Sequence, residues 1–168
     1  ALMCSCAIDA IEGRRVVTCN IPGVFMQSDW PKKEFSTYIR FDGSMVDIIC
    51  EIEPKYKKYV INTQRGNRIL YGEMNKAVYG SVLSSVLFYN KLSDFLIENG
   101  YEVNPYDGCT FNKMVDGDQL TIQFHVDDLK CSHRDQQVLE DVIDMLNNKF
   151  RTKTQELLVT RGTVHEYL

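Results

Sequence analysis

The chain has 168 residues, and its 19 lysines and arginines against 23 aspartates and glutamates give a formal net charge of −4. Hydrophobic residues make up 44% and charged residues 25%, which excludes disordered, collagen-like and disulfide-framework proteins. No stretch reaches the ~18 consecutive apolar residues of a membrane helix, and the N-terminal residues do not follow the pattern of a secretion signal. We therefore expect one soluble, non-secreted domain of ordinary size.

The cysteines and the overall charge exclude two further classes. The six cysteines form no CxxC pair and have no histidine at zinc spacing, so we expect reduced, mostly buried thiols. The histidines His125, His133 and His165 are likewise expected on the surface or on a strand face rather than as metal ligands. An acidic chain does not coat nucleic acid by bulk charge, although a local basic groove is compatible with this composition.

The N-terminal third predicts a helix and then a strand. Residues 1–11 have helical spacing, with one face formed by Leu2, Cys6 and Ala10. No capping residue precedes this helix, so we expect a fragment cut inside an element. Residues 15–21 are rich in β-branched side chains and end at Pro22. This pattern places Asn20 at the C-terminal end of a strand, a position that often holds functional polar residues.

The middle of the chain predicts two strand segments and a long helix. The apolar run 46–52 stops at Pro54 and is interpreted as a strand. Residues 59–61 and 68–71 are expected to form a hairpin around the turn at 64–67.

From residue 81 to residue 99 the apolar residues recur at helical spacing, and Gly100 is a suitable C-terminal cap.

The C-terminal third predicts a strand hairpin and a second helix. Residues 120–126 alternate between apolar and polar side chains, so they form a strand that presents Asp127 at its end. A return strand over 129–132 follows, and Asp135 caps an amphipathic helix that extends to Phe150. The order of elements predicts an α+β fold.

Adjacent Asp127 and Asp128 at the tip of this hairpin have two interpretations. Turns favour aspartate, so a solvated turn explains most pairs of this kind. The alternative is a site for a divalent cation, because two carboxylates at one hairpin tip supply the oxygen ligands that such ions prefer. The residue pattern by itself leaves both open.

Several segments are typical of one known family: "EGRRVVTCNIPGVFMQSD", "LYGEMNKAVYG", "NPYDGCTFNKMVDGDQLTIQFHVDDLKCSH" and "VTRGTVHEYL". The chain resembles the reverse transcriptase domain of copia-type LTR retrotransposons along its whole length. The resemblance implies a polymerase palm, an antiparallel sheet with packed helices, and part of the fingers over residues 1–168. It also implies truncation at both ends, before Ala1 and at Tyr167-Leu168.

The resemblance implies a catalytic role for the hairpin carboxylates. Family members hold two Mg²⁺ (or Mn²⁺) ions with three aspartates, and Asp127 and Asp128 match two of them. Two such ions stabilise the attacking and leaving oxygens when a primer hydroxyl joins a deoxynucleotide. Phe25 matches the aromatic gate against ribonucleotides, with ordinary core packing as the alternative.

The chain departs from the family at other positions. Asn20 stands in place of the first metal-binding aspartate, and it offers one neutral oxygen instead of a bridging carboxylate. Leu83 replaces a frequent glutamine that contacts nucleotide or template, and His125 replaces the usual tyrosine. These departures predict a catalytically impaired copy.

The implied partners are an RNA or DNA template with its primer, deoxynucleoside triphosphates, and the remainder of a retrotransposon polyprotein, with no membrane. The implied location is intracellular, in a cytoplasmic particle or the nucleus. Two basic clusters could contact phosphates, although a solvated, salt-bridged surface is favoured: Lys55, Lys57 and Lys58 with Tyr56 and Tyr59, and Arg65 with Arg68. Three hypotheses follow: a polymerase by descent, an inactive remnant, and a repurposed interaction module.

Overall fold

The computed structural model describes residues 2–32 and 36–162, so the predictions for Ala1, His165, Tyr167 and Leu168 lie outside the described residues. The elements in chain order are α1 (Leu2–Glu12), β1 (Arg15–Asn20), η1 (Phe25–Gln27), β2 (Tyr38–Asp42), α2 (Ser44–Ile52), η2 (Pro54–Tyr59), β3 (Ile61–Asn62), β4 (Arg68–Glu73), α3 (Val82–Glu98), β5 (Glu102–Asn104), β6 (Asp107–Val115), β7 (Asp118–His125), β8 (Asp128–His133), α4 (Gln136–Phe150) and β9 (Leu158–Arg161).

The chain divides into two compact units. Residues 1–28 and 78–168 form unit 1, and residues 29–77 form unit 2. The single domain over 1–168 stays a prediction, since one domain can contain two compact units. The expected α+β class is confirmed at the level of antiparallel sheets with several helices.

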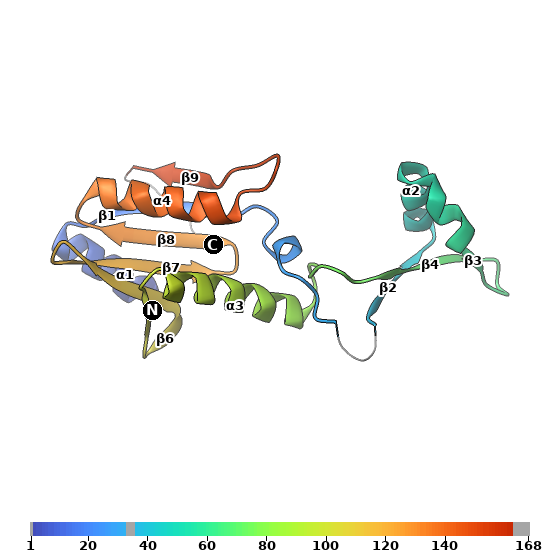
Figure 1. Ribbon diagram of the computed structural model, residues 1–168, viewed down its shortest axis with the longest axis horizontal. Coiled ribbons are helices and arrows are strands. Elements are labelled where there is room, and N and C mark those ends of the chain that lie inside the picture. The colour runs from blue at the N-terminus through green and yellow to red at the C-terminus, as the bar shows by residue number, and fades with distance from the viewer. Residues whose placement is uncertain (1, 33–35, 163–168) are drawn as a thin grey trace. The chain divides into compact units, whose positions relative to one another are not determined.

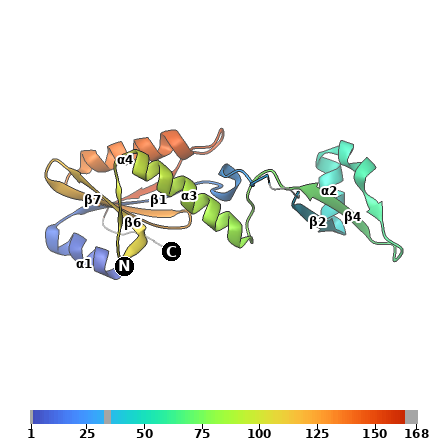
Figure 2. The same cartoon turned by 60° about the horizontal axis from the view of Figure 1, so that its bottom comes forward.

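Unit 1 is a three-layer arrangement around one sheet. The six strands lie in the order β5-β6-β7-β8-β1-β9, and every neighbouring pair is antiparallel. Helices α3 and α4 lie on one face of this sheet and α1 lies on the other (Figures 1 and 2). Chain order therefore separates β1 from its partner β8 by the whole of unit 2 and by α3.

The face of the sheet toward α3 and α4 is apolar. Strand alternation places Val17 and Cys19 of β1 beside Leu129 and Cys131 of β8 on this face, and all four are buried. The helices complete the core with side chains that are almost inaccessible to solvent: Phe88, Leu92 and Leu96 from α3, and Leu139, Leu146 and Phe150 from α4. This packing supplies most of the apolar burial in unit 1.

The opposite face of the sheet is polar although it is buried. Thr18, Thr121, Gln123, Lys130 and Ser132 share this face, and each is less than 9% exposed. An apolar helix could not satisfy these groups, since a buried polar atom without a partner is costly. Thr121 and Gln123 bond to Asn112 and Thr110 within the sheet, whereas Lys130 takes its partners from α1.

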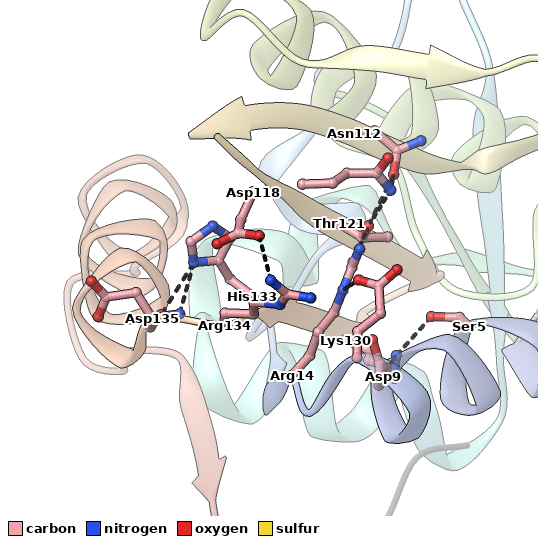
Figure 3. Close-up of polar contacts among 12 residues, drawn as sticks. Ser5, Asp9, Arg14, Asn112, Asp118, Thr121, Lys130, His133, Arg134 and Asp135 are labelled. Carbon is pink, nitrogen blue, oxygen red and sulfur yellow. Dashed lines mark hydrogen bonds and ion pairs between the residues drawn. The ribbon is translucent and has the colours of Figure 1, made fainter. Parts of the chain in front are cut away.

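Helix α1 docks through an ion pair. Lys130 donates to Ser5 Oγ at 2.7 Å and pairs with Asp9, and the two charged side chains are only 6% and 7% exposed (Figure 3). The predicted helix is confirmed, and its one buried side chain among the described residues is Asp9, while Cys6 and Ala10 are exposed. The cause is Lys130, whose buried charge requires a carboxylate partner.

The termini of the two long helices follow the prediction. Asp135 caps α4, where its Oδ1 accepts a hydrogen bond from the Gln137 amide at 2.8 Å. Gly100 follows α3 with a φ of +82°, and the Tyr101 amide donates to Leu96 O at 3.1 Å. Helix α4 therefore begins at its predicted cap, and α3 ends at its predicted glycine.

Edge strand β9 is held to α4 by Arg161, whose Nε donates to Glu140 Oε1 at 2.9 Å. This hydrogen bond and the one from Gln136 lower the pKa of Glu140 to about 2, so the carboxylate stays ionised well into the acid range.

Unit 2 has a three-stranded antiparallel sheet in the order β2-β4-β3, with α2 and η2 beside it. The predicted hairpin is confirmed, since Ile61 pairs with Ile69 and Asn62 with Arg68, although Tyr59 belongs to η2 rather than to the strand. A small core of Val46, Cys50 and Leu70 joins α2 to this sheet.

The strand predicted over 46–52 is wrong, because these residues form α2. The buried residues Val46 and Cys50 are four apart, which is helical spacing, while Ile48 and Ile52 are 49% and 78% exposed. The apolar run contains no strict alternation, so its β-branched content misled the prediction. Pro54 ends the segment as expected.

The six cysteines are free, as predicted, but only three are buried: Cys19, Cys50 and Cys131. Cys4 and Cys6 of α1 are exposed, and Cys109 is partly buried. Among the described residues, no helix combines the length and apolar character needed to cross a membrane.

The ion pair under α1 can be tested by substitution. We expect Lys130→Met to lower the free energy of unfolding by about 3 to 5 kcal/mol, because it leaves the Asp9 carboxylate buried without a cation. Lys130→Met combined with Asp9→Leu should recover most of this loss. Arg134→Met is the control, since Arg134 and Asp118 form an exposed pair that contributes about 1 kcal/mol or less. Urea denaturation measures all three variants, and a loss below about 1 kcal/mol for Lys130→Met alone would contradict the account.

Candidate functional site

The pairing of β1 with β8 brings Asn20 and Asp128 together. The register places these residues directly opposite each other at the end of both strands. Asn20 Nδ2 donates a hydrogen bond to Asp128 Oδ1 at 2.9 Å, between residues 108 positions apart in the chain. Two of the three residues proposed for the metal site therefore touch.

Asp127 is placed by the turn between β7 and β8. His125 pairs with Asp128, so Val126 and Asp127 form a two-residue loop. Val126 has a φ of +56°, a conformation that is strained for a β-branched residue. The Asp127 carbonyl accepts a hydrogen bond from the Ile21 amide at 2.9 Å, which fixes the turn against the end of β1. The structure thus brings Asn20, Asp127 and Asp128 together where β1 ends and β8 begins.

This site lies at the end of the polar face of the sheet. Alternation puts Asn20 and Asp128 on the same face as Thr18 and Lys130. Both aspartates are partly exposed, whereas Lys130, two residues along β8, is buried in its pair with Asp9. The positive charge of Lys130 on β8 therefore pairs with α1 and not with the two aspartates.

The donor set does not fit a centre for two cations. Within residues 2–32 and 36–162, no group of three His, Cys, Asp or Glu side chains is placed to hold a metal ion. Asn20 supplies an amide that donates to Asp128, where a carboxylate would have bridged two ions. Two carboxylates remain at the site, those of Asp127 and Asp128, and Asp128 accepts a hydrogen bond from Asn20.

Phe25 lies in η1, close to the end of β1. Its ring is only 6% exposed and contacts the ring of Tyr79 edge-on, with centroids 4.6 Å apart. Gln27 fastens this loop, since its Nε2 donates to Pro22 O at 2.9 Å and to Phe150 O at 2.6 Å. The ring is therefore packed and held in place, and its role as a gate stays a prediction.

Leu83 occupies the first turn of α3 and is partly exposed. Its neighbour Ser84 is fully buried, and Ser84 Oγ accepts a hydrogen bond from the Val78 amide at 3.1 Å. This contact ties α3 to the loop that contains Tyr79. The nucleotide-binding role of Leu83 stays a prediction.

The histidines occupy different environments. His125 is exposed beside the hairpin tip, as expected. His133 lies on strand β8 but is 2% exposed, and its Nδ1 accepts from the Asp135 amide at 3.0 Å. His133 therefore helps to shape the start of α4 rather than a metal site.

The supporting contacts of the site could not be predicted from the sequence. Gln27 donates to the carbonyls of Pro22, five positions away, and Phe150, 123 positions away, and Ser84 accepts from the Val78 amide six positions away. A single sequence contains no signal for such backbone partners. The pair of Lys130 and Asp9 has a weak signal, since a lysine between buried strand residues requires a counter-charge.

The contact between Asn20 and Asp128 predicts a graded loss of stability. Asn20→Ala should lower the free energy of unfolding by about 1 kcal/mol through loss of one hydrogen bond. Asn20→Asp should cost more without divalent ions, because two carboxylates then face each other.

Asn148→Asp is the matched control, since it adds the same charge at an exposed position of α4. Thermal denaturation in EDTA at neutral pH measures the difference. Equal stability of the Asn20→Asp and Asn148→Asp variants at neutral pH would contradict the proposed contact.

Comparison with known proteins gives one match. The family described as reverse transcriptase (RNA-dependent DNA polymerase) matches residues 47–162, which include Leu83, Asp127 and Asp128, while Asn20 and Phe25 precede the matched range. Searches of curated proteins and of solved structures gave no match. Because the match spans more than half of the chain and contains the hairpin with both aspartates, the chain belongs to the reverse transcriptase (RNA-dependent DNA polymerase) family.

Proposed function

We propose that the chain is the palm, with part of the fingers, of a copia-type retrotransposon reverse transcriptase, and that its nucleotidyl transfer is impaired at Asn20. The family match supports a polymerase-like domain. The observation that carries the proposal of impairment is the hydrogen bond from Asn20 Nδ2 to Asp128 Oδ1 at 2.9 Å. It shows an amide donor on the strand end where the resemblance expects a third carboxylate.

The charge of the site explains the impairment. Family members generally use divalent metal ions, for which the resemblance implies three carboxylates. Here Asp127 and Asp128 supply two negative charges and Asn20 supplies none, so less charge opposes the repulsion between two divalent cations. Each 1.36 kcal/mol lost from the transition state lowers the rate tenfold. A deficit of several kcal/mol would reduce the reaction by about a thousandfold or more.

The remaining residues would serve binding and positioning. The partners proposed are a template with its primer and deoxynucleoside triphosphates, together with the rest of an intracellular retrotransposon polyprotein. The strained turn at Val126 holds both aspartates at the end of β1, and the packed ring of Phe25 lies in the loop that follows β1. The alternative is an inactive remnant that acts at most as an interaction module for nucleic acid or protein.

Primer extension separates these possibilities. The chain and its Asn20→Asp variant are each joined to the flanking segments of an active relative and given an RNA template, primer and Mg²⁺ or Mn²⁺. We expect extension only with Asn20→Asp, because that change restores the third carboxylate.

Asn20→Asp combined with Asp128→Asn is the control, and it should be inactive because it again has only two carboxylates. Extension by the unmodified chain at the rate of the Asn20→Asp variant would overturn the proposed impairment. If neither version extends, the remnant alternative is favoured.

A further inference from the structure

Strand β2 forms an edge of the sheet in unit 2. The strands lie in the order β2-β4-β3, so among the residues that the structure describes β2 has a paired strand on one side only (Figure 2). The strand at the opposite edge, β3, has two residues, whereas β2 has five. The unpaired amides and carbonyls of such an edge can pair with a further strand. The outer side of β2 is therefore a candidate interaction surface.

The hydrogen bonds to β4 show which main-chain groups of β2 point outward. The Gly43 amide donates to Arg68 O at 3.2 Å, and the Met74 amide donates to Thr37 O at 2.9 Å. Residues that bond to the neighbouring strand alternate with residues that do not, so the odd-numbered residues of this segment bond to β4. The main-chain groups on the free edge then belong to three residues: Tyr38, Arg40 and Asp42.

The charges on this edge do not protect it against pairing with every strand. Edge strands commonly resist pairing through a proline, a bulge or charges of one sign. β2 contains no proline, and its register with β4 has no shift. Its two charges have opposite signs, since Arg40 and Asp42 form an ion pair at 2.8 Å and both side chains are exposed. Such an edge accepts a strand that carries the same two charges in the reverse order.

We propose that a second copy of this chain pairs with the outer edge of β2, antiparallel and related by a two-fold axis that passes through Phe41. In this register Arg40 of one protomer lies opposite Asp42 of its partner, and the reverse. Both are then hydrogen-bonded pairs, as their outward main-chain groups require. Opposite charges directly across an antiparallel pair are stabilising, whereas a two-fold axis at Arg40 would set two arginines opposite each other.

The helix that follows β2 adds an apolar surface to this edge. Gly43 alone separates β2 from α2, and α2 packs through Val46 and Cys50 against the face of the sheet that contains Phe41. Its remaining exposed apolar residues lie three and four positions apart, on one side of the helix, and are 49% to 78% exposed: Met45, Ile48 and Ile52. Because the two-fold axis is perpendicular to the sheet, both copies of α2 lie over the same face of the joined sheet.

A second copy fits this edge better than an unrelated extended peptide. A peptide that adds a strand uses the same main-chain groups and sets no requirement on the charges of β2. Opposite charges at alternate positions are matched by the same strand in the reverse direction, which is the self-complementarity that a two-fold dimer needs. This dimer requires neither Asn20, a metal ion nor a template, so it goes beyond the proposed function.

Sedimentation velocity of the full chain in EDTA, over a range of protein concentrations, tests the proposal. We expect the mean mass to rise from that of one chain toward that of two. Arg40→Asp and Asp42→Arg should each weaken the association at least about tenfold, because each change sets like charges opposite each other. An equimolar mixture of the two variants should associate to within about threefold of the unmodified chain, since opposite charges then meet again.

Arg65→Asp is the charge-matched control at an exposed position of unit 2, and it should change the association constant by less than about twofold. Circular dichroism checks that each variant is folded. Amide hydrogen exchange, followed by NMR, should slow at Arg40 and Asp42 as the chain associates. The proposal is overturned if the unmodified chain stays monomeric up to about 1 mM, if the control weakens association as much as Arg40→Asp, or if the mixture associates no better than the separate variants.

Discussion

The antiparallel pairing of β1 with β8 is the constraint on which unit 1 depends. Its register sets Asn20 opposite Asp128 and, at the same time, puts Val17, Cys19 and Leu129 on the apolar face under α3 and α4. A slip of β1 by one residue would turn Asn20 into the apolar core and Val17 and Cys19 to the polar side, while β8 would stay in register with β7. The apolar packing therefore fixes the geometry of the candidate site, and the turn at Val126 brings Asp127 to the same edge.

The candidate site and the docking site of α1 lie on the same polar face of the sheet in unit 1. Lys130 lies on the same face as Asp128, and its buried charge is matched by Asp9 of α1. At the exposed end of this face, Asn20 meets Asp128 through a hydrogen bond that a third carboxylate could not make without a proton or a cation. Asn20 thus stabilises the strand end without a bound ion. An asparagine also lacks the negative charge that an aspartate would offer to two metal ions.

Sequence patterns predicted those helices and strands that are determined by residues close together in the chain. The alternation over 120–126, the cap at Asp135 and the glycine after α3 each determine an element from nearby residues, and all three were confirmed. The pairing of Asn20 with Asp128 was foreseen only through the family resemblance, because the two residues are 108 positions apart. The prediction failed for α2, which was interpreted as a strand because its apolar run obscured the helical spacing of Val46 and Cys50. The burial of Asp9 against Lys130 was not predicted, because the two residues are far apart in the chain.

The proposal that Asn20 weakens the binding of divalent ions is tested most directly by counting the ions that the chain binds in the absence of substrates. Titration of the full chain with Mn²⁺, followed by electron paramagnetic resonance of the unbound ion, measures number and affinity together. We expect no pair of tight sites in the unmodified chain and a clear gain in affinity for Asn20→Asp, because the third carboxylate restores the missing charge. Two equally tight Mn²⁺ ions in both proteins, lost from both with Asp128→Asn, would contradict the claim that Asn20 disables the site.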